Sequence, residues 1–151
     1  MTPPRSAIDA AVVASRSSLC RSKRGVCIWS NDFILATGFN HQPGRLVCDQ
    51  TEKCKSSCRL TAVHAEQSAL LRCCFPYKLK GAQLLHVKTV EGLPVPSGGP
   101  SCLECSKLCL EAGIATVWLL HERGWQAYPA DVFHRLTLAH CGIEVGSEAA
   151  R

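Results

Sequence analysis

Two short stretches decide the fold of this 151-residue chain: His64-Ala65-Glu66 and Pro100-Ser101-Cys102-Leu103-Glu104-Cys105. Cys102 and Cys105 stand at positions i and i+3, so on the first turn of a helix both thiolates can hold one ion. His64 and Glu66 are two residues apart and would point away from each other inside a helix. They can approach one centre if His64 lies at the helix N-terminus. The pattern therefore predicts a site between two helix N-termini, an end that favours thiolates.

The number of ligands indicates the kind of metal site. One histidine and two cysteines leave a fourth position open, which is typical of catalytic rather than structural zinc. Two thiolates cancel the charge of the ion, so it acidifies a bound water less than a zinc held by three neutral imidazoles. Such a site needs a nearby base, and we expect Glu66 to be that base without being a ligand.

The composition favours one globular domain over residues 1–151. The sequence is 46 % apolar, and it shows neither a run long enough for a transmembrane helix nor a secretory signal. Its eleven cysteines are therefore expected to be thiols in a reducing, cytoplasmic compartment. The net charge of +5 fits a phosphate-bearing small ligand, and it is too small and scattered to favour duplex nucleic acid.

Apolar periodicity and turn residues predict an alternation of strands and helices. Helices are expected at 6–18, 61–74, 102–112 and 130–140, and strands at 25–30, 33–37, 83–90, 114–121 and 143–145. Residues 42–59 and 91–100 are expected to be loops, and the first of these is long enough to suggest a function. This order predicts a three-layer α/β/α sandwich around a mixed sheet of about five strands.

The paired motifs His-x-Glu and Pro-x-Cys-x-x-Cys resemble the zinc-dependent cytidine deaminase superfamily, whose signature is H-x-E followed by P-C-x-x-C. The chain is most similar to deoxycytidylate deaminases. The similarity runs from about residue 19 to 145 and includes Ala36-Thr37-Gly38-Phe39-Asn40 and Val63-His64-Ala65-Glu66-Gln67-Ser68-Ala69-Leu70. Three features depart from the family. Ser101 separates the proline from the first cysteine, residues 90–99 are longer than the usual connection, and residues 42–59 lack a pattern that matches phosphate or nucleotide-effector binding.

The resemblance implies that zinc is bound by His64, Cys102 and Cys105. Glu66 would move protons, the Ala65 N–H would hold the pyrimidine carbonyl, and Asn40 would bind the sugar. Phe39, His41 and Trp125 would form walls around the base. A second, structural zinc could be held by Cys48, Cys54 and Cys58, with Cys20 or a histidine as the fourth ligand.

The implied reaction converts a cytosine nucleotide or nucleoside, with dCMP favoured, to the uracil product and ammonia. A homo-oligomer is expected by analogy. Arg45, Lys53 and Arg59 are candidates for contacting phosphate, or they form a solvated basic loop. Three alternatives remain: a deaminase of another amino-heterocycle, a single-stranded nucleic-acid cytosine deaminase, and a zinc-stabilised scaffold. Low aromatic content opposes the second, and the presence of Glu66 opposes the third.

Overall fold

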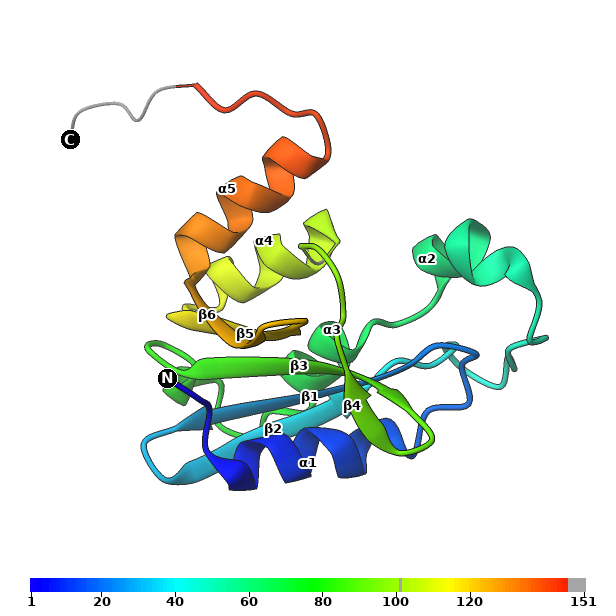
Figure 1. The fold of residues 1–151 in the computed structure, drawn as a ribbon, viewed down its shortest axis with the longest axis horizontal. Helices are drawn as coiled ribbons and strands as arrows, with labels where there is room; N and C mark the ends of the chain where they lie inside the picture. Colours follow the sequence, from blue (N-terminus) through cyan, green and yellow to red (C-terminus); the bar gives the residue numbers. More distant parts are fainter. Residues whose placement is uncertain (101, 147–151) are drawn as a thin grey trace.

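The centre of the fold is a six-stranded mixed sheet with the path β2-β1-β3-β5-β6 (Figure 1). The strands are β1 (Lys23–Ser30), β2 (Phe33–Phe39), β3 (Gln83–Val90), β4 (Leu93–Val95), β5 (Thr116–His121) and β6 (Gly124–Pro129). β3 and β5 are parallel, whereas the other pairs are antiparallel, and β4 pairs only with the end of β3. This computed structural model describes residues 1–100 and 102–146, without the side chains of residues 54 and 55. Ser101 lies outside the described residues.

Helices cover both faces of the sheet. The helices are α1 (Arg5–Ser15), α2 (Ser57–Thr61), α3 (Ala65–Arg72), α4 (Leu103–Glu111) and α5 (Ala130–His140), with 3-10 turns at Glu52–Lys55 and Pro76–Lys78. α1 lies on one face, where Ala7 and Ala11 pack with Trp29 and Trp118. α4 and α5 lie on the opposite face (Figure 1). On that side α3, α4 and α5 contribute Ala69, Cys109 and Phe133 to the larger core.

The structure confirms the predicted α/β class with a mixed sheet and corrects three details. No strand was expected at residues 124–129, which form β6, because Gly-Trp-Gln-Ala-Tyr-Pro follows a turn and has no β-branched residue. β4 lies inside the segment expected to be a loop. The strand expected at 143–145 is absent, because these residues are exposed and the Ile143 N–H bonds to the Leu138 carbonyl at 3.0 Å and so closes α5.

One glycine brings α3 onto the sheet. A Cβ on Gly38 of β2 would lie 2.3 Å from the Ala69 nitrogen and 2.5 Å from the Ala65 oxygen, both in the backbone of α3. Only a residue without a side chain permits this approach. Because α3 begins next to His64, this contact also fixes the depth at which the site lies. Among the described helices, none is long and apolar enough to cross a bilayer.

Candidate active site

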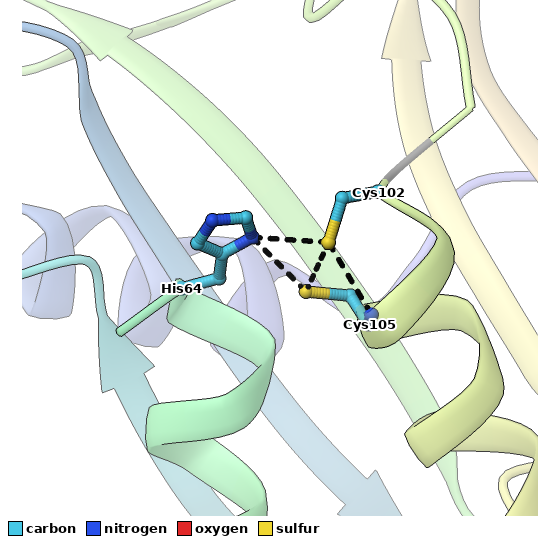
Figure 2. Close-up of side chains that lie close together, drawn as sticks. All are labelled: His64, Cys102 and Cys105. Carbon is cyan, nitrogen blue, oxygen red and sulfur yellow. Dashed lines mark hydrogen bonds between the residues drawn. The ribbon is translucent and has the colours of Figure 1, made fainter. Parts of the chain in front are cut away.

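His64, Cys102 and Cys105 meet at one point between α3 and α4 (Figure 2). The Nδ1 atom of His64 lies 3.1 Å from the Cys102 sulfur and 3.2 Å from the Cys105 sulfur, and the two sulfurs are 3.1 Å apart. The ligand atoms of all three residues lie within 4.8 Å of one another. Two soft thiolates and one imidazole are a donor set that suits zinc, so these residues fit the metal that the sequence predicts.

Both helices present the ligands at their N-termini. His64 is the N-cap of α3, with extended backbone, and its own N–H bonds to the Gln67 side chain at 2.9 Å. Cys102 is the N-cap of α4, and its sulfur accepts a bond from the Cys105 N–H at 3.3 Å. The positive ends of two helix dipoles therefore face the thiolates and stabilise their charge.

The ligand charges depend on one another. The pKa of Cys102 is lowered to about 5, because bonds from Cys105 and His64 to its sulfur outweigh the effect of burial. The pKa of His64 is raised to about 9, chiefly by its bond to Cys102. The pKa of Cys105 is raised, because it shares a proton with Cys102 and is buried. Without metal, the site is therefore an imidazolium beside one thiolate and one thiol.

Glu66 follows in the first turn of α3 and is 6 % exposed. Burial by itself would raise its pKa, but His86, its own backbone N–H, His64 and Arg24 together lower it. The group is thus held as a carboxylate in a buried position beside the three ligands. A carboxylate of this kind can accept a proton from a water molecule next to it.

A cavity of about 590 Å³ opens in front of these residues. His64, Ala65, Glu66 and Cys102 line it together with Asn40. Its further lining includes three arginines, Arg21, Arg24 and Arg59, of which Arg21 pairs with Glu52 at 2.8 Å. His86 and His140 also line it, and burial lowers the pKa of His86. Glu66 is the acidic side chain among the residues that line it. The cavity therefore favours a negatively charged ligand.

Asn40 lines the cavity but also closes the β1–β2 hairpin. Its Oδ1 accepts bonds from the Arg24 N–H and the Ser18 hydroxyl, both at 2.8 Å. Its Nδ2 donates to the Ser22 carbonyl at 2.7 Å. One Nδ2 proton remains for a ligand, since an amide nitrogen carries two.

The three residues expected as walls around the base have contacts outside the cavity lining. Phe39 contacts His41, with the ring centroids 5.4 Å apart, and the Arg72 guanidinium lies 4.6 Å above the Phe39 ring. Trp125 packs against the cluster on the α1 face of the sheet. Phe39, His41 and Trp125 are not among the residues that line the cavity. Spacing along the sequence could not show these contacts.

Three thiols that the sequence suggests for a second zinc line the cavity. Cys20, Cys48 and Cys58 line the cavity, whereas the Cys54 side chain lies outside the described residues. The pKa of Cys20 is raised by burial and by the charges of Cys48 and Cys58, so the three are neighbours. Among the described side chains, the group able to hold a metal ion is His64, Cys102 and Cys105.

The basic loop contributes one of its three expected phosphate contacts to the cavity. Arg59 lines it, whereas Lys53 pairs with Asp49 at 3.2 Å, and Arg45 is not among the lining residues. Sequence reasoning missed Arg24, His86 and Ser97, which also line the cavity. The period-2 alternation of β1 and β3 could have placed Arg24 and His86 on the site-facing side of the sheet.

Comparison with solved structures supports the same family. The dCMP deaminase of cyanophage S-TIM5, in complex with dCMP and dUMP, is 28 % identical, with a TM-score of 0.55 over 78 % of this chain and 82 % of that one. Its apo form is 26 % identical, with a TM-score of 0.52 over 74 % and 77 % of the two chains. The cytidine deaminase of Burkholderia pseudomallei shares the fold, with 18 % identity and a TM-score of 0.60 over 87 % and 96 %.

No family model matches the sequence, and no curated protein matches it significantly. The mixed sheet, the histidine-cysteine-cysteine group and the structural likeness place the chain in the cytidine and deoxycytidylate deaminase superfamily of hydrolases. Within that superfamily, the two structures that are 26 % and 28 % identical to this chain are both of the dCMP deaminase of cyanophage S-TIM5.

Proposed function

We propose that the protein hydrolyses the exocyclic amine of a cytosine nucleotide, with dCMP as the preferred substrate, giving the uracil nucleotide and ammonia. The observation that carries this proposal is the buried carboxylate of Glu66 beside three metal-ligating side chains, at the bottom of a cavity large enough for a nucleotide. A carboxylate, a soft-ligand metal site and an adjacent cavity are the parts that hydrolytic deamination needs.

His64 Nδ1 and the sulfurs of Cys102 and Cys105 would hold a zinc ion, which when bound polarises the water that attacks the ring. The donor set fits this ion. His64 offers Nδ1 because its Nε2 lies 2.9 Å from the Arg59 carbonyl and donates its proton there. A ring nitrogen fixed in this way keeps the other nitrogen free as a ligand.

Glu66 is the proposed proton carrier. It accepts a proton from the attacking water and delivers it to ring N3. It then accepts the proton of the new C4 hydroxyl and delivers it to the departing amine, so that the C4–N bond breaks as the C4 carbonyl forms. One water is consumed and one ammonia released, so Glu66 ends in its starting state. The Ala65 N–H in the first turn of α3 has no partner within the helix and is proposed to bond the pyrimidine O2. The remaining Nδ2 proton of Asn40 is proposed to bond the sugar.

The preference for a nucleotide over a nucleoside follows from charge. Three arginines line the cavity, and Glu66 is the acidic residue among those that line it. Arg59 and His140 are exposed, whereas Glu66 is buried. A substrate placed with its ring at Glu66 would have its 5′-phosphate near the exposed end, where an arginine can pair with it.

Release of ammonia from a substrate panel tests this function. The zinc-loaded protein is given dCMP, CMP, deoxycytidine, cytidine, cytosine, dCTP and a single-stranded oligonucleotide, each alongside Glu66→Ala. We expect dCMP to be turned over well above deoxycytidine, and the variant to be inactive with zinc still bound. If zinc is bound and no cytosine compound reacts, the cytosine assignment is wrong. The oligonucleotide arm tests nucleic-acid deamination, whose binding should weaken steeply with salt.

The second zinc remains a proposal with its own measurement. Cys48, Cys58 and Cys20 all line the cavity. A metal held by Cys48, Cys54 and Cys58, with Cys20 or a histidine as the fourth ligand, would therefore tie the long loop to the site. Metal analysis should give two equivalents in the wild type and one in Cys48→Ser. One equivalent in both would show that these thiols hold no metal.

We also propose a homo-oligomer in a cytoplasmic location. Leu70, Leu71 and Leu108 line an apolar groove of about 500 Å³ between α3 and α4, and Leu71 is 82 % exposed. An exposed apolar face of this kind is typical of subunit contacts. Sedimentation velocity should show an assembly that Leu71→Glu weakens. The proposed location rests on the ten described cysteines being free thiols, the state that a reducing compartment maintains.

A further inference from the structure

Arg24 and His86 share the face of the sheet on which the site lies. Val26 on β1 is the register partner of His86 on β3. Val26 and Leu84 pack in the core beneath α3 and α4, whereas Leu85 and Val87 pack toward α1. Side chains two residues apart along a strand share a face, so Arg24 lies beside Val26 and His86 beside Leu84. Arg24 and His86 therefore lie at the edge of the core on this face, where they line the cavity.

Three polar groups at this place lack adequate partners. His86 is 8 % exposed, lines the cavity and makes no hydrogen bond to the described residues. The Ser97 hydroxyl is buried, lines the same cavity and has no partner among the described residues. The Arg24 guanidinium has five N–H donors, and its bond within the described residues is a long one of 3.3 Å from Nε to the Ser22 hydroxyl. Buried polar groups normally have hydrogen-bond partners. We therefore expect a bound ligand to be the partner of these three groups.

The proposed reaction leaves one edge of the cytosine ring unrecognised. Ala65 serves O2, Glu66 serves N3 and the amine, and the sugar occupies N1. The remaining edge carries C5 and C6. His86 and Glu66 are buried in the lining of the cavity and Arg24 is half-buried there, whereas Arg59 and His140 are exposed. We therefore place His86 and Arg24 by the reacting ring and not by the exposed end of the cavity. Groups at this depth would meet a ring substituent before they met the phosphate.

We propose that Arg24, His86 and Ser97 form a recognition site for an oxygen-bearing substituent at C5 of the cytosine ring, such as hydroxymethyl, formyl or carboxyl. The proposal rests on the deaminase function above and narrows its substrate to a C5-oxygenated cytosine nucleotide. The guanidinium and the serine hydroxyl can donate to such an oxygen, and the imidazole can donate or accept.

Kinetics of the zinc-loaded protein on dCMP and 5-hydroxymethyl-dCMP test this site. The wild type should show kcat/KM about tenfold higher for the hydroxymethyl compound, the gain expected from one or two added hydrogen bonds. Ser97→Ala and His86→Val should each reduce this ratio toward one. Ser68→Ala is the matched control, because its hydroxyl is also buried without a described partner but does not line the cavity. It should leave the ratio unchanged.

Calorimetry with the two products, dUMP and 5-hydroxymethyl-dUMP, gives a readout without turnover. The same tenfold preference is expected in Kd. If His86→Val does not fold, Ser97→Ala still tests the site, because the Ser97 hydroxyl has no hydrogen bond within the described residues that the substitution would remove. The C5 site would be overturned if dCMP and 5-hydroxymethyl-dCMP gave equal kcat/KM and if the two products bound with equal Kd. Turnover of dCMP in that experiment would still support the deaminase function. If Ser97→Ala or His86→Val instead changed the ratio of kcat/KM for dCMP to that for deoxycytidine, the C5 site would be wrong and the residues would contact the phosphate. If no cytosine compound were turned over and neither product bound preferentially, both the deaminase function and the C5 site would be wrong.

Discussion

The Nε2 atom of His64 lies 2.9 Å from the backbone carbonyl oxygen of Arg59, and this contact determines which ring nitrogen faces the two thiols. Nε2 carries the proton that the carbonyl accepts, so the Nδ1 lone pair points at the metal position. The last turn of α2 thereby supports the first ligand of α3. A residue that the sequence suggests as a phosphate contact thus also acts through its backbone on the metal site.

Arg59→Ala separates these two roles. The substitution keeps the carbonyl, so zinc content by plasma mass spectrometry should stay at the wild-type value. The loss of one charge-assisted contact should raise KM for dCMP by about tenfold or more. Activity on deoxycytidine is the internal control and should not change, since it has no phosphate. A loss of zinc would show that the side chain, and not the carbonyl, holds the loop.

Glu66→Gln tests the proton carrier with little change in shape. The amide fills the same buried space but cannot accept the proton, so kcat should fall by about 10²–10⁴ or more. Zinc content should be retained, because Glu66 is not a ligand. The measurement is single-turnover kinetics of dCMP with a parallel metal assay. Residual activity within tenfold of the wild type would assign the proton transfer to another group.

The main elements of the fold could be predicted because local patterns carry them. α5 begins and ends where the sequence indicates, with Pro129 before it and Gly142 after it. β6 could not be predicted, because its strand character comes from pairing with β5 along its whole length. The two helix N-termini at the site follow from spacing alone, since His64 and Glu66 can meet one centre only around a helix end.

The rest of the site depends on where side chains point across the sheet. Trp125 and Phe39 were expected beside the base from the resemblance, yet neither lines the cavity and each contacts other residues. Arg24 and His86 are far apart in sequence and become neighbours only through the register of β1 with β3. Sequence periodicity gives the face of a strand but not the register between strands.

Thiol labelling should separate the cysteines by burial. Burial raises the pKa of Cys27 to about 12, so this thiol stays protonated at any pH below that value. At pH 8, iodoacetamide should modify the exposed Cys74 and Cys141 within minutes and leave Cys27 intact until urea unfolds the protein. Peptide mass spectrometry gives the rates. Modification of native Cys27 at the rate of Cys74 would contradict the core described here.

Metal removal should expose one further reactive thiol. Zinc bound to Cys102 blocks alkylation, and a chelator leaves a half-buried thiolate with a pKa of about 5. At pH 6, where ordinary thiols are protonated, Cys102 should then label first. Chelation should also lower the midpoint of thermal unfolding, because zinc binds the folded state. Identical labelling with and without chelator would show that Cys102 does not hold the ion.

Gly38→Ala tests whether the approach of α3 to the sheet sets the geometry of the site. The added Cβ would lie 2.3 Å from the Ala69 nitrogen, so α3 or β2 must move. Overpacking of this kind should lower the free energy of unfolding by about 1–3 kcal/mol. Urea denaturation measures this loss. Gly146→Ala is the control, because its Cβ would meet nothing within 4 Å and stability should stay unchanged.

The same variant should bind zinc more weakly, because α3 carries His64 at its start while Cys102 and Cys105 belong to α4. A shift of one helix relative to the other separates an imidazole from two sulfurs that now lie 3.1 and 3.2 Å from it. Competition with a chromogenic chelator measures the affinity. If stability falls and zinc affinity does not, α3 and α4 move together, and the ligand geometry is set by their mutual contact and not by β2.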